Sequence, residues 1–168
     1  MTAPLGALAR GAAALTRGSI ILAAVLMLAA LCWQVAARYV LGEPSIWSEE
    51  LAVLLFSWTV LGGLALGVRE GWHVRLTLLP DALPRALRVW TERATDLLTA
   101  ALGGFLAWSG WRFLDITSGS ISAAIGYPIE ILNVLAPVSG ALMALFALER
   151  ALRPGGALPA AEPGPGTA

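Results

Sequence analysis

The 168-residue sequence has one cysteine, one histidine and no lysine, and these shortages exclude several kinds of chemistry. A single cysteine cannot form a disulfide or a cysteine metal site within one chain. A single histidine, His73, excludes haem held by two histidines of the same chain. The sequence has no ligand cluster with metal spacing, no phosphate-binding glycine loop and no nucleophile elbow. We therefore expect no enzyme activity, no cofactor, no metal and no nucleic-acid partner.

Charge is also scarce. Charged residues make up 13% of the chain and hydrophobic residues 58%, with a mean hydropathy of +0.76, whereas a soluble domain has about 25% charged residues. Three stretches carry no charge: Gly18 to Ala37 is 20 residues long, and Leu51 to Val68 and Ile131 to Leu148 are 18 residues each. Each is long enough to cross about 30 Å of hydrocarbon as a helix. The sequence therefore predicts an integral membrane protein.

A fourth span is weaker but visible. It runs from Leu97 to Phe113 and is interrupted by Arg112, and Trp90 and Trp111 flank it at a helical separation of about 32 Å. We predict an all-α fold with four transmembrane helices at about 18–40, 47–68, 88–115 and 129–150, within a membrane domain of 18–153. We expect residues 1–17 to form a cytoplasmic N-terminal segment and the Pro/Gly-rich residues 154–168 to form a disordered tail. A signal peptide is the alternative for the first span, but its apolar run exceeds the usual length and further spans follow.

The arginines predict the orientation. With four spans and the N-terminus inside, only Arg38 and Arg112 lie outside, so the positive-inside rule gives N-in and C-in. The connection before the third span carries Leu76, Leu78 and Leu79 and is expected to lie at the cytoplasmic interface. The remaining arginines would all lie inside: Arg10, Arg17, Arg69, Arg75, Arg85, Arg88, Arg93, Arg150 and Arg153.

Small residues within the spans indicate helix packing, either within the chain or with a partner. Gly63 and Gly67 are one such pair, and Gly103 and Ala107 are another. The central turns of the first, second and fourth spans contain no ionisable residue, which an ion-coupled carrier working alone normally needs. Asp96 is the nearest candidate, and pairing with Arg93 explains it more simply.

One group of residues resembles a known family. It comprises Arg38, Pro44, the run Trp47-Ser48-Glu49-Glu50-Leu51, Gly62-Gly63, Arg69 and His73. This pattern is similar to the small membrane subunit of tripartite ATP-independent periplasmic (TRAP) transporters, the DctQ type.

The resemblance implies a multi-pass protein of the bacterial inner membrane, surrounded by lipid. Its partners would be a large TRAP permease and a periplasmic solute-binding protein, and the complex would import an organic acid driven by a cation gradient. The large subunit would hold the substrate and ion sites, and this chain would brace it. Two alternatives are the small membrane subunit of a tripartite tricarboxylate transporter and the membrane anchor of a redox complex. The anchor would need histidine ligands within the spans, which are missing.

The residues at the start of the second span are the main candidate site. Glu49 and Glu50 lie in the first helical turn, where a negative charge stabilises the positive helix end by about 0.3 to 1 kcal/mol. They could equally contact a partner protein. Trp47 is expected to anchor this end at the interface, and Arg38 to pair with one of the two glutamates. His73 is expected to contact headgroups or backbone at the opposite interface.

Overall fold

The computed structural model describes residues 3–43, 45–71, 85–122 and 125–152. The regular structure of these residues is helical, apart from an isolated bridge between Ile121 and Pro128. The predicted all-α class is therefore confirmed. The helices are α1 (Ala3–Ala36), continued by a π-helical turn η1 (Ala37–Leu41), then α2 (Ile46–Glu70), α3 (Arg85–Ile116), α4 (Glu130–Asn133) and α5 (Leu135–Ala151).

Among the described residues, three helical segments are long and apolar enough to cross a membrane: Leu5–Leu41, Ile46–Glu70 and Glu130–Ala151. The expected fourth span falls within α3, which has 32 residues but is not among the three. Its sequence includes Glu92, Arg93, Asp96 and Arg112, which lower its hydropathy. The four-span count and the N-in, C-in orientation therefore stay predictions. The interfacial segment with Leu76, Leu78 and Leu79 and the tail 154–168 lie outside the described residues.

Glycines end two of the helices. Gly42 follows η1 with a φ of 74°, and Gly71 follows α2 with a φ of 73°. Glycine adopts this left-handed conformation without the steric penalty of a Cβ atom. The Gly71 N–H donates to the carbonyl of Gly67, which satisfies one of the free carbonyls at the end of α2. The end of this helix is therefore set by local sequence.

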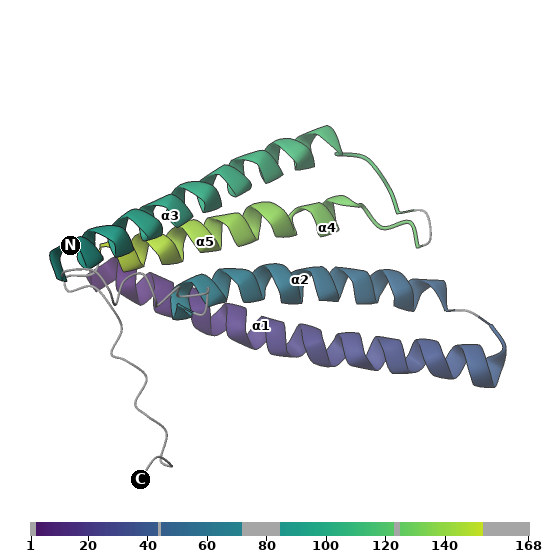
Figure 1. Ribbon diagram of the computed structural model, residues 1–168. Coiled ribbons are helices and arrows are strands. Elements are labelled where there is room, and N and C mark those ends of the chain that lie inside the picture. The colour runs from purple at the N-terminus through teal and green to yellow at the C-terminus, as the bar shows by residue number, and fades with distance from the viewer. Residues whose placement is uncertain (1–2, 44, 72–84, 123–124, 153–168) are drawn as a thin grey trace, which may run out of the picture.

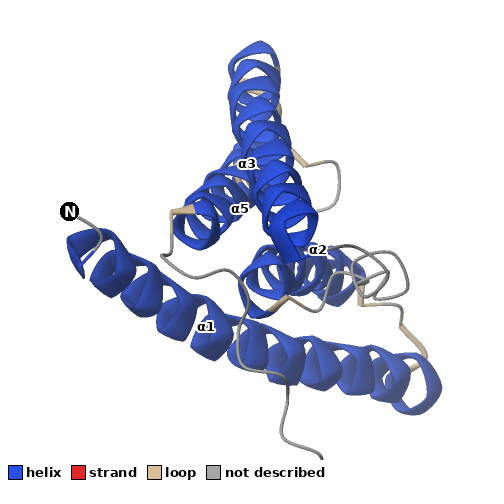
Figure 2. Cartoon of the chain, turned by 60° about the vertical axis from the view of Figure 1, so that its left-hand side comes forward, coloured by secondary structure: helices blue, strands red, loops and turns tan. Residues whose placement is uncertain are grey.

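The four long helices form two antiparallel hairpins, α1 with α2 and α3 with α5 (Figure 1). Helices α2 and α5 lie side by side and join the hairpins, whereas α3 packs mainly on α5 and forms one edge (Figure 2). The helices converge where α2 and α5 end, and they spread apart at the opposite end (Figure 1). We call these the converging end and the spreading end.

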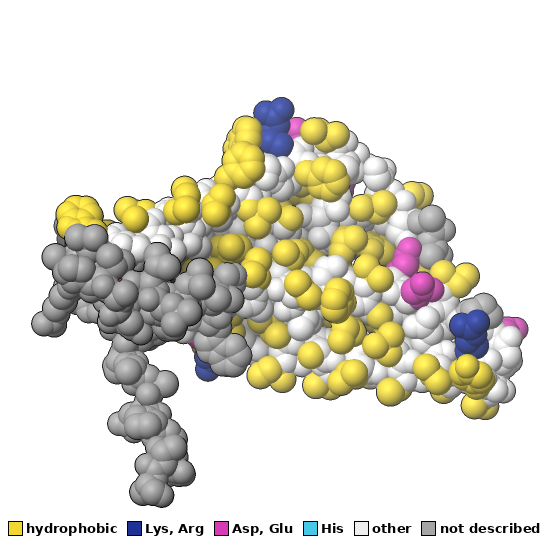
Figure 3. Space-filling view, viewed as in Figure 1, with side chains coloured by type: hydrophobic (Ala, Val, Ile, Leu, Met, Phe, Trp, Pro, Cys, Tyr) yellow, Lys and Arg dark blue, Asp and Glu magenta, His cyan; other side chains and the backbone are white. Residues whose placement is uncertain are grey.

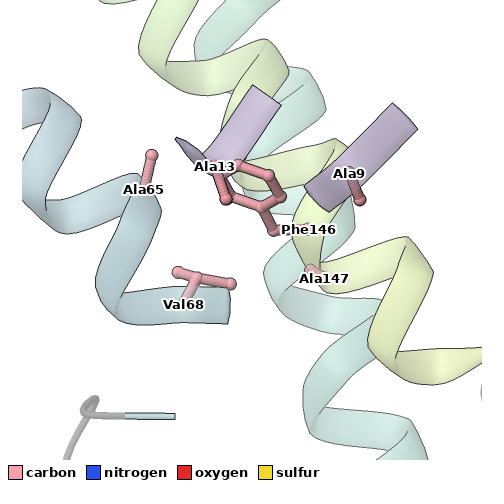
Figure 4. Close-up of a cluster of buried hydrophobic side chains, with 6 residues drawn as sticks. All are labelled: Ala9, Ala13, Ala65, Val68, Phe146 and Ala147. Carbon is pink, nitrogen blue, oxygen red and sulfur yellow. The ribbon is translucent and has the colours of Figure 1, made fainter. Parts of the chain in front are cut away.

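A small buried cluster holds the converging end together (Figure 4). Phe146 of α5 is fully buried, and alanines surround it, so the helix backbones approach closely. Helix α1 begins at Ala3, and its buried Ala9 and Ala13 belong to this cluster. The segment 1–17, expected to precede the first span as a separate part, is thus largely a continuation of that helix. The cluster consists of Ala9, Ala13, Ala65, Val68, Phe146 and Ala147.

Glycines bring α3 and α5 into direct backbone contact. A Cβ atom built on Gly140 would lie 2.5 Å from the Ala107 nitrogen, and one built on Gly103 would lie 2.7 Å from the Ala144 nitrogen. Gly110 similarly meets Pro137, at 2.8 Å from its Cδ atom. The structure therefore places Gly103 and Ala107 at the contact between α3 and α5.

In α2, Gly62 makes a close contact that Gly63 does not make. A Cβ atom built on Gly62 would lie 3.2 Å from a side-chain carbon of Ile20 in α1, whereas one built on Gly63 meets nothing within 4 Å. Gly62 therefore faces α1, and Gly63, the next residue around the helix, does not. Between the same helices, the indole N–H of Trp58 donates to the Ser19 hydroxyl at 3.1 Å. A contact of Gly63 with a partner protein stays a prediction.

Candidate functional site

The described residues contain no group of three or more His, Cys, Asp or Glu side chains placed to hold a metal ion. A hollow of about 220 Å³ lies at the spreading end, where α3 ends and α4 begins. It is open to the surroundings and is lined by Trp111, Leu114, Asp115, Ser118 and Glu130. The more developed feature is a set of charged contacts between helices at the converging end.

Arg69 and Glu149 form the most buried of these contacts. Arg69 lies in the last turn of α2, and its Nε is 3.6 Å from Oε2 of Glu149 in α5. The Glu149 side chain is 4% exposed and that of Arg69 19%. The guanidinium also lies 5.9 Å from the centre of the Phe146 ring, a cation–π arrangement. Each charge therefore compensates the other in a site largely shielded from water.

Arg150, the next residue of α5, reaches both neighbouring helices. One of its nitrogens is 3.1 Å from Oδ1 of Asp96 in α3, and the other donates to the Val68 carbonyl of α2 at 2.6 Å. That carbonyl lies in the last turn of α2, where carbonyls lack helical partners and attract positive charge. Asp96 thus pairs with Arg150 rather than with the expected Arg93, because its face of α3 packs on α5.

An outer contact links the first hairpin. Arg17 of α1 pairs with Glu70 of α2, and their side chains are 60% and 27% exposed. Together these contacts join all four long helices, and we call them the converging-end network. Glu149 and Arg150 form its centre, and neither was predicted as a site residue from the sequence. The available signal was a glutamate directly beside an arginine at the end of an 18-residue apolar run. The network consists of Arg17, Arg69, Glu70, Asp96, Glu149 and Arg150.

At the spreading end, the structure separates residues that the sequence suggested would meet. Glu50 accepts a hydrogen bond from the hydroxyl of Ser122, which follows α3. Glu49 and Arg38 are exposed, and Trp47 is 46% exposed. Within the described parts of the chain, Arg38 forms no ion pair with Glu49 or Glu50, so the expected pairing is wrong. The reason is that Glu50 faces the connection after α3, while Arg38 projects outward from η1.

The other predicted site residues are spread over the chain. Arg69 belongs to the converging-end network. Gly67 contributes its carbonyl to the end of α2. His73 lies outside the described residues. The described members of this motif therefore do not form one compact site, because they are spread from Arg38 in η1 to Arg69 in the last turn of α2.

Long apolar helices with paired charges at their ends define an integral membrane protein. A family model described as "Tripartite ATP-independent periplasmic transporters, DctQ component" matches residues 27–154. The chain therefore belongs to the DctQ component family of these transporters, which confirms the resemblance seen in the sequence. It is a multi-pass protein of the bacterial inner membrane and a member of a family of transporter subunits.

Curated relatives agree with this assignment. The sialic acid TRAP transporter small permease protein SiaQ of Vibrio cholerae is 31% identical over 124 residues, 74% of this chain and 72% of the relative. The ectoine TRAP transporter small permease protein TeaB of Halomonas elongata is 30% identical over 106 residues, 62% and 55% of the two chains. The sialic acid TRAP transporter permease protein SiaT of Haemophilus influenzae is 32% identical over 110 residues, 66% of this chain but 18% of SiaT.

Proposed function

We propose that this small permease subunit braces a large permease during cation-coupled import of an organic acid, which a periplasmic binding protein delivers. The match to the DctQ component over residues 27–154 carries this proposal. The alignment with SiaT supports a large permease as the partner. In SiaT, the segment similar to this chain is a small part of a much longer permease.

The position of the charges supports an accessory role. The ion pairs of the described residues lie at the converging end and bind helices to one another, so they are not free to coordinate a solute. The middle turns of the three apolar spans contain no ionisable residue. An ion-coupled carrier normally needs such a group at membrane depth. We therefore assign the substrate and cation sites to the large permease. SiaQ and TeaB are named for different solutes, so they do not set the substrate of this chain.

Helix α3 is the fourth span of this proposal. It runs antiparallel to α5 and meets it through glycines at Gly103 and Gly110. Because α5 lies within one of the apolar segments, we infer that α3, packed against it, also crosses the bilayer. A length of 32 residues corresponds to about 48 Å, enough to cross the hydrocarbon and extend beyond it. The arginine distribution then sets the N-in, C-in orientation and makes the converging end cytoplasmic.

The topology can be tested with reporter fusions. Reporters placed after Leu41 and Ser120 are expected to read as periplasmic, because these positions follow the first and third spans. Reporters placed after Leu79 and Pro154 are expected to read as cytoplasmic. Alkaline phosphatase and green fluorescent protein fusions give opposite signals and so control for expression. A periplasmic signal at Leu79 would contradict the four-span model.

The motif at the start of α2 is assigned to partner contact at the periplasmic side. Oε2 of Glu50 is buried and has no hydrogen-bond partner among the described residues. A buried carboxylate oxygen without a partner is costly, so the described residues leave this end of α2 incompletely satisfied. Glu49 and Trp47 lie beside it at the surface, and Arg38 lies on the preceding turn. Arg69 lies in the last turn at the other end of the same helix, and His73 is proposed as a further contact of that end.

The accessory role predicts that the isolated chain moves no solute. In proteoliposomes with an imposed sodium gradient, the purified chain alone should give uptake of labelled organic acids no higher than empty vesicles. The complex purified in mild detergent with its large permease, supplemented with the binding protein, should give gradient-dependent uptake. The same complex supplemented with heat-denatured binding protein serves as the control. Uptake by the small chain alone would refute the accessory role.

A further inference from the structure

Helix α3 exposes several large aromatic side chains, namely Trp90, Phe105, Trp108, Trp111 and Phe113. It lies at the edge of the helix array (Figure 2), and its glycine face packs on α5. On the opposite face, side chains recur every three or four residues, which is the spacing found along a contact between packed helices. Its side chains are exposed, with Leu98 at 62%, Phe105 at 62% and Trp108 at 61%. We call this the α3 open face, formed by Ala94, Leu98, Ala101, Phe105, Trp108 and Arg112.

Lipid covers this face poorly at one point. Trp108 has an indole N–H for which the described residues provide no acceptor. Trp58, in contrast, donates its indole N–H to the Ser19 hydroxyl at 3.1 Å. An unsatisfied N–H group costs free energy in hydrocarbon, where no water can replace the missing acceptor.

Arg112 adds a charge at the same place. Its guanidinium lies 6.0 Å from the centre of the Trp108 ring, one helical turn towards the middle of α3. No ion pair forms between Arg112 and any other part of the chain that the structure describes. Gly110, two residues away, packs on Pro137, so Arg112 lies at the level of the first turn of α5. This level falls within the apolar segment Glu130–Ala151, whereas the sequence placed Arg112 outside the span. A charge at this depth is normally paired or turned towards protein.

The open side of α1 differs in character. Its exposed side chains in the middle of the span are aliphatic, such as Ile21, Leu22, Val25 and Leu28. Hydrocarbon solvates these residues without leaving any polar group unsatisfied. Figure 3 likewise shows hydrophobic side chains over much of the visible face and charged ones near the helix ends. Of the two edges of the array, α3 is therefore the one that a protein covers better than lipid does.

We propose that the α3 open face docks a transmembrane helix of the large permease, which places an acceptor group against Trp108 and Arg112. This inference rests on the proposed function, since the partner is taken from it. The permease is the favoured occupant because, in SiaT, a segment similar to this chain belongs to the same polypeptide as a much longer permease. Tryptophan and arginine are also the residues that most often dominate binding at protein interfaces.

Photocrosslinking in the intact membrane tests the surface. Benzoylphenylalanine is introduced at Phe105 or Trp108 on the α3 open face, and at Leu22 or Val25 on α1 as matched controls. The chain is co-expressed with the large permease and the binding protein, irradiated, and analysed by immunoblotting and mass spectrometry. We expect adducts with the large permease from the two α3 positions and none from the two α1 positions.

The outcomes separate the surface from the function. Failure of the unmodified chain to copurify with the permease would refute the proposed function itself. Copurification with adducts from α1 but not from α3 would refute the docking surface alone. Adducts between two copies of this chain, or irradiation without any protein adduct, would likewise refute it by assigning the face to a second copy or to lipid.

A substitution provides an independent measurement. Trp108→Ala is expected to lower the amount of permease that copurifies about tenfold or more, as for a central interface residue. The melting temperature of the isolated chain should stay nearly unchanged, because the Trp108 side chain is largely exposed within it. Leu22→Ala is the matched control and should leave permease recovery unchanged. Equal recovery with Trp108→Ala and with the unmodified chain would contradict the proposal.

Discussion

Gly140→Val is expected to push α3 away from α5 and to lower the melting temperature of the isolated chain in detergent by roughly 6 to 12 °C. The added Cβ atom would lie 2.5 Å from the Ala107 nitrogen and 2.8 Å from the Gly103 oxygen. Both are backbone atoms of α3, so no side-chain rotation can relieve the overlap and the helices must separate. An overpacked contact of this kind costs about 3 kcal/mol, and each 1 kcal/mol shifts the melting temperature by about 2 to 4 °C at this chain length.

The matched control is Gly63→Val in α2. It makes the same change within a helix, but a Cβ atom on Gly63 meets nothing within 4 Å. Because the two substitutions have the same effect on helix propensity, the difference between them measures the contact between α3 and α5. Intrinsic tryptophan fluorescence during heating provides the melting curves. Equal losses for the two variants would mean that close approach at Gly140 does not stabilise the structure.

Glu149→Leu is expected to be the most damaging single change in the converging-end network. It leaves Arg69 without the carboxylate 3.6 Å from its Nε, in a contact where the side chains are 4% and 19% exposed. Removing one member of a buried ion pair costs about 3 to 5 kcal/mol, because the remaining charge is uncompensated. The free energy of unfolding, measured by chemical denaturation in mixed micelles, should fall by this amount. The yield of folded protein in membranes should fall with it.

A double substitution distinguishes loss of the pair from loss of a side chain. Arg69→Met combined with Glu149→Leu removes both charges, and it should recover at least half of the stability lost in Glu149→Leu. Arg17→Ala is the control at the exposed pair with Glu70, where the arginine is 60% exposed, and it should cost about 1 kcal/mol or less. A double variant no more stable than Glu149→Leu would show that Arg69 and Glu149 are not energetically coupled.

The sequence was informative wherever local composition decides the structure. Uncharged runs of 18 to 20 residues specify helices in a bilayer, because a backbone in hydrocarbon must satisfy its hydrogen bonds internally. Gly42 and Gly71 mark where two helices end. The run from Trp47 to Leu51 indicated the family that the comparison with residues 27–154 established. The helix at 88–115 was recognisable too, although its charges lower its hydropathy and keep it out of the set of apolar segments.

The partners of individual side chains were decided by tertiary structure alone. Asp96 pairs with Arg150, Glu50 bonds Ser122, and neither contact follows from sequence spacing. Gly62 rather than Gly63 faces α1. Periodicity places a residue on one face of a helix, but the rotation and tilt of that helix against its neighbours determine what the face meets. In this chain, close contact between glycines and alanines from distant segments sets those rotations, and so sets which charges are paired.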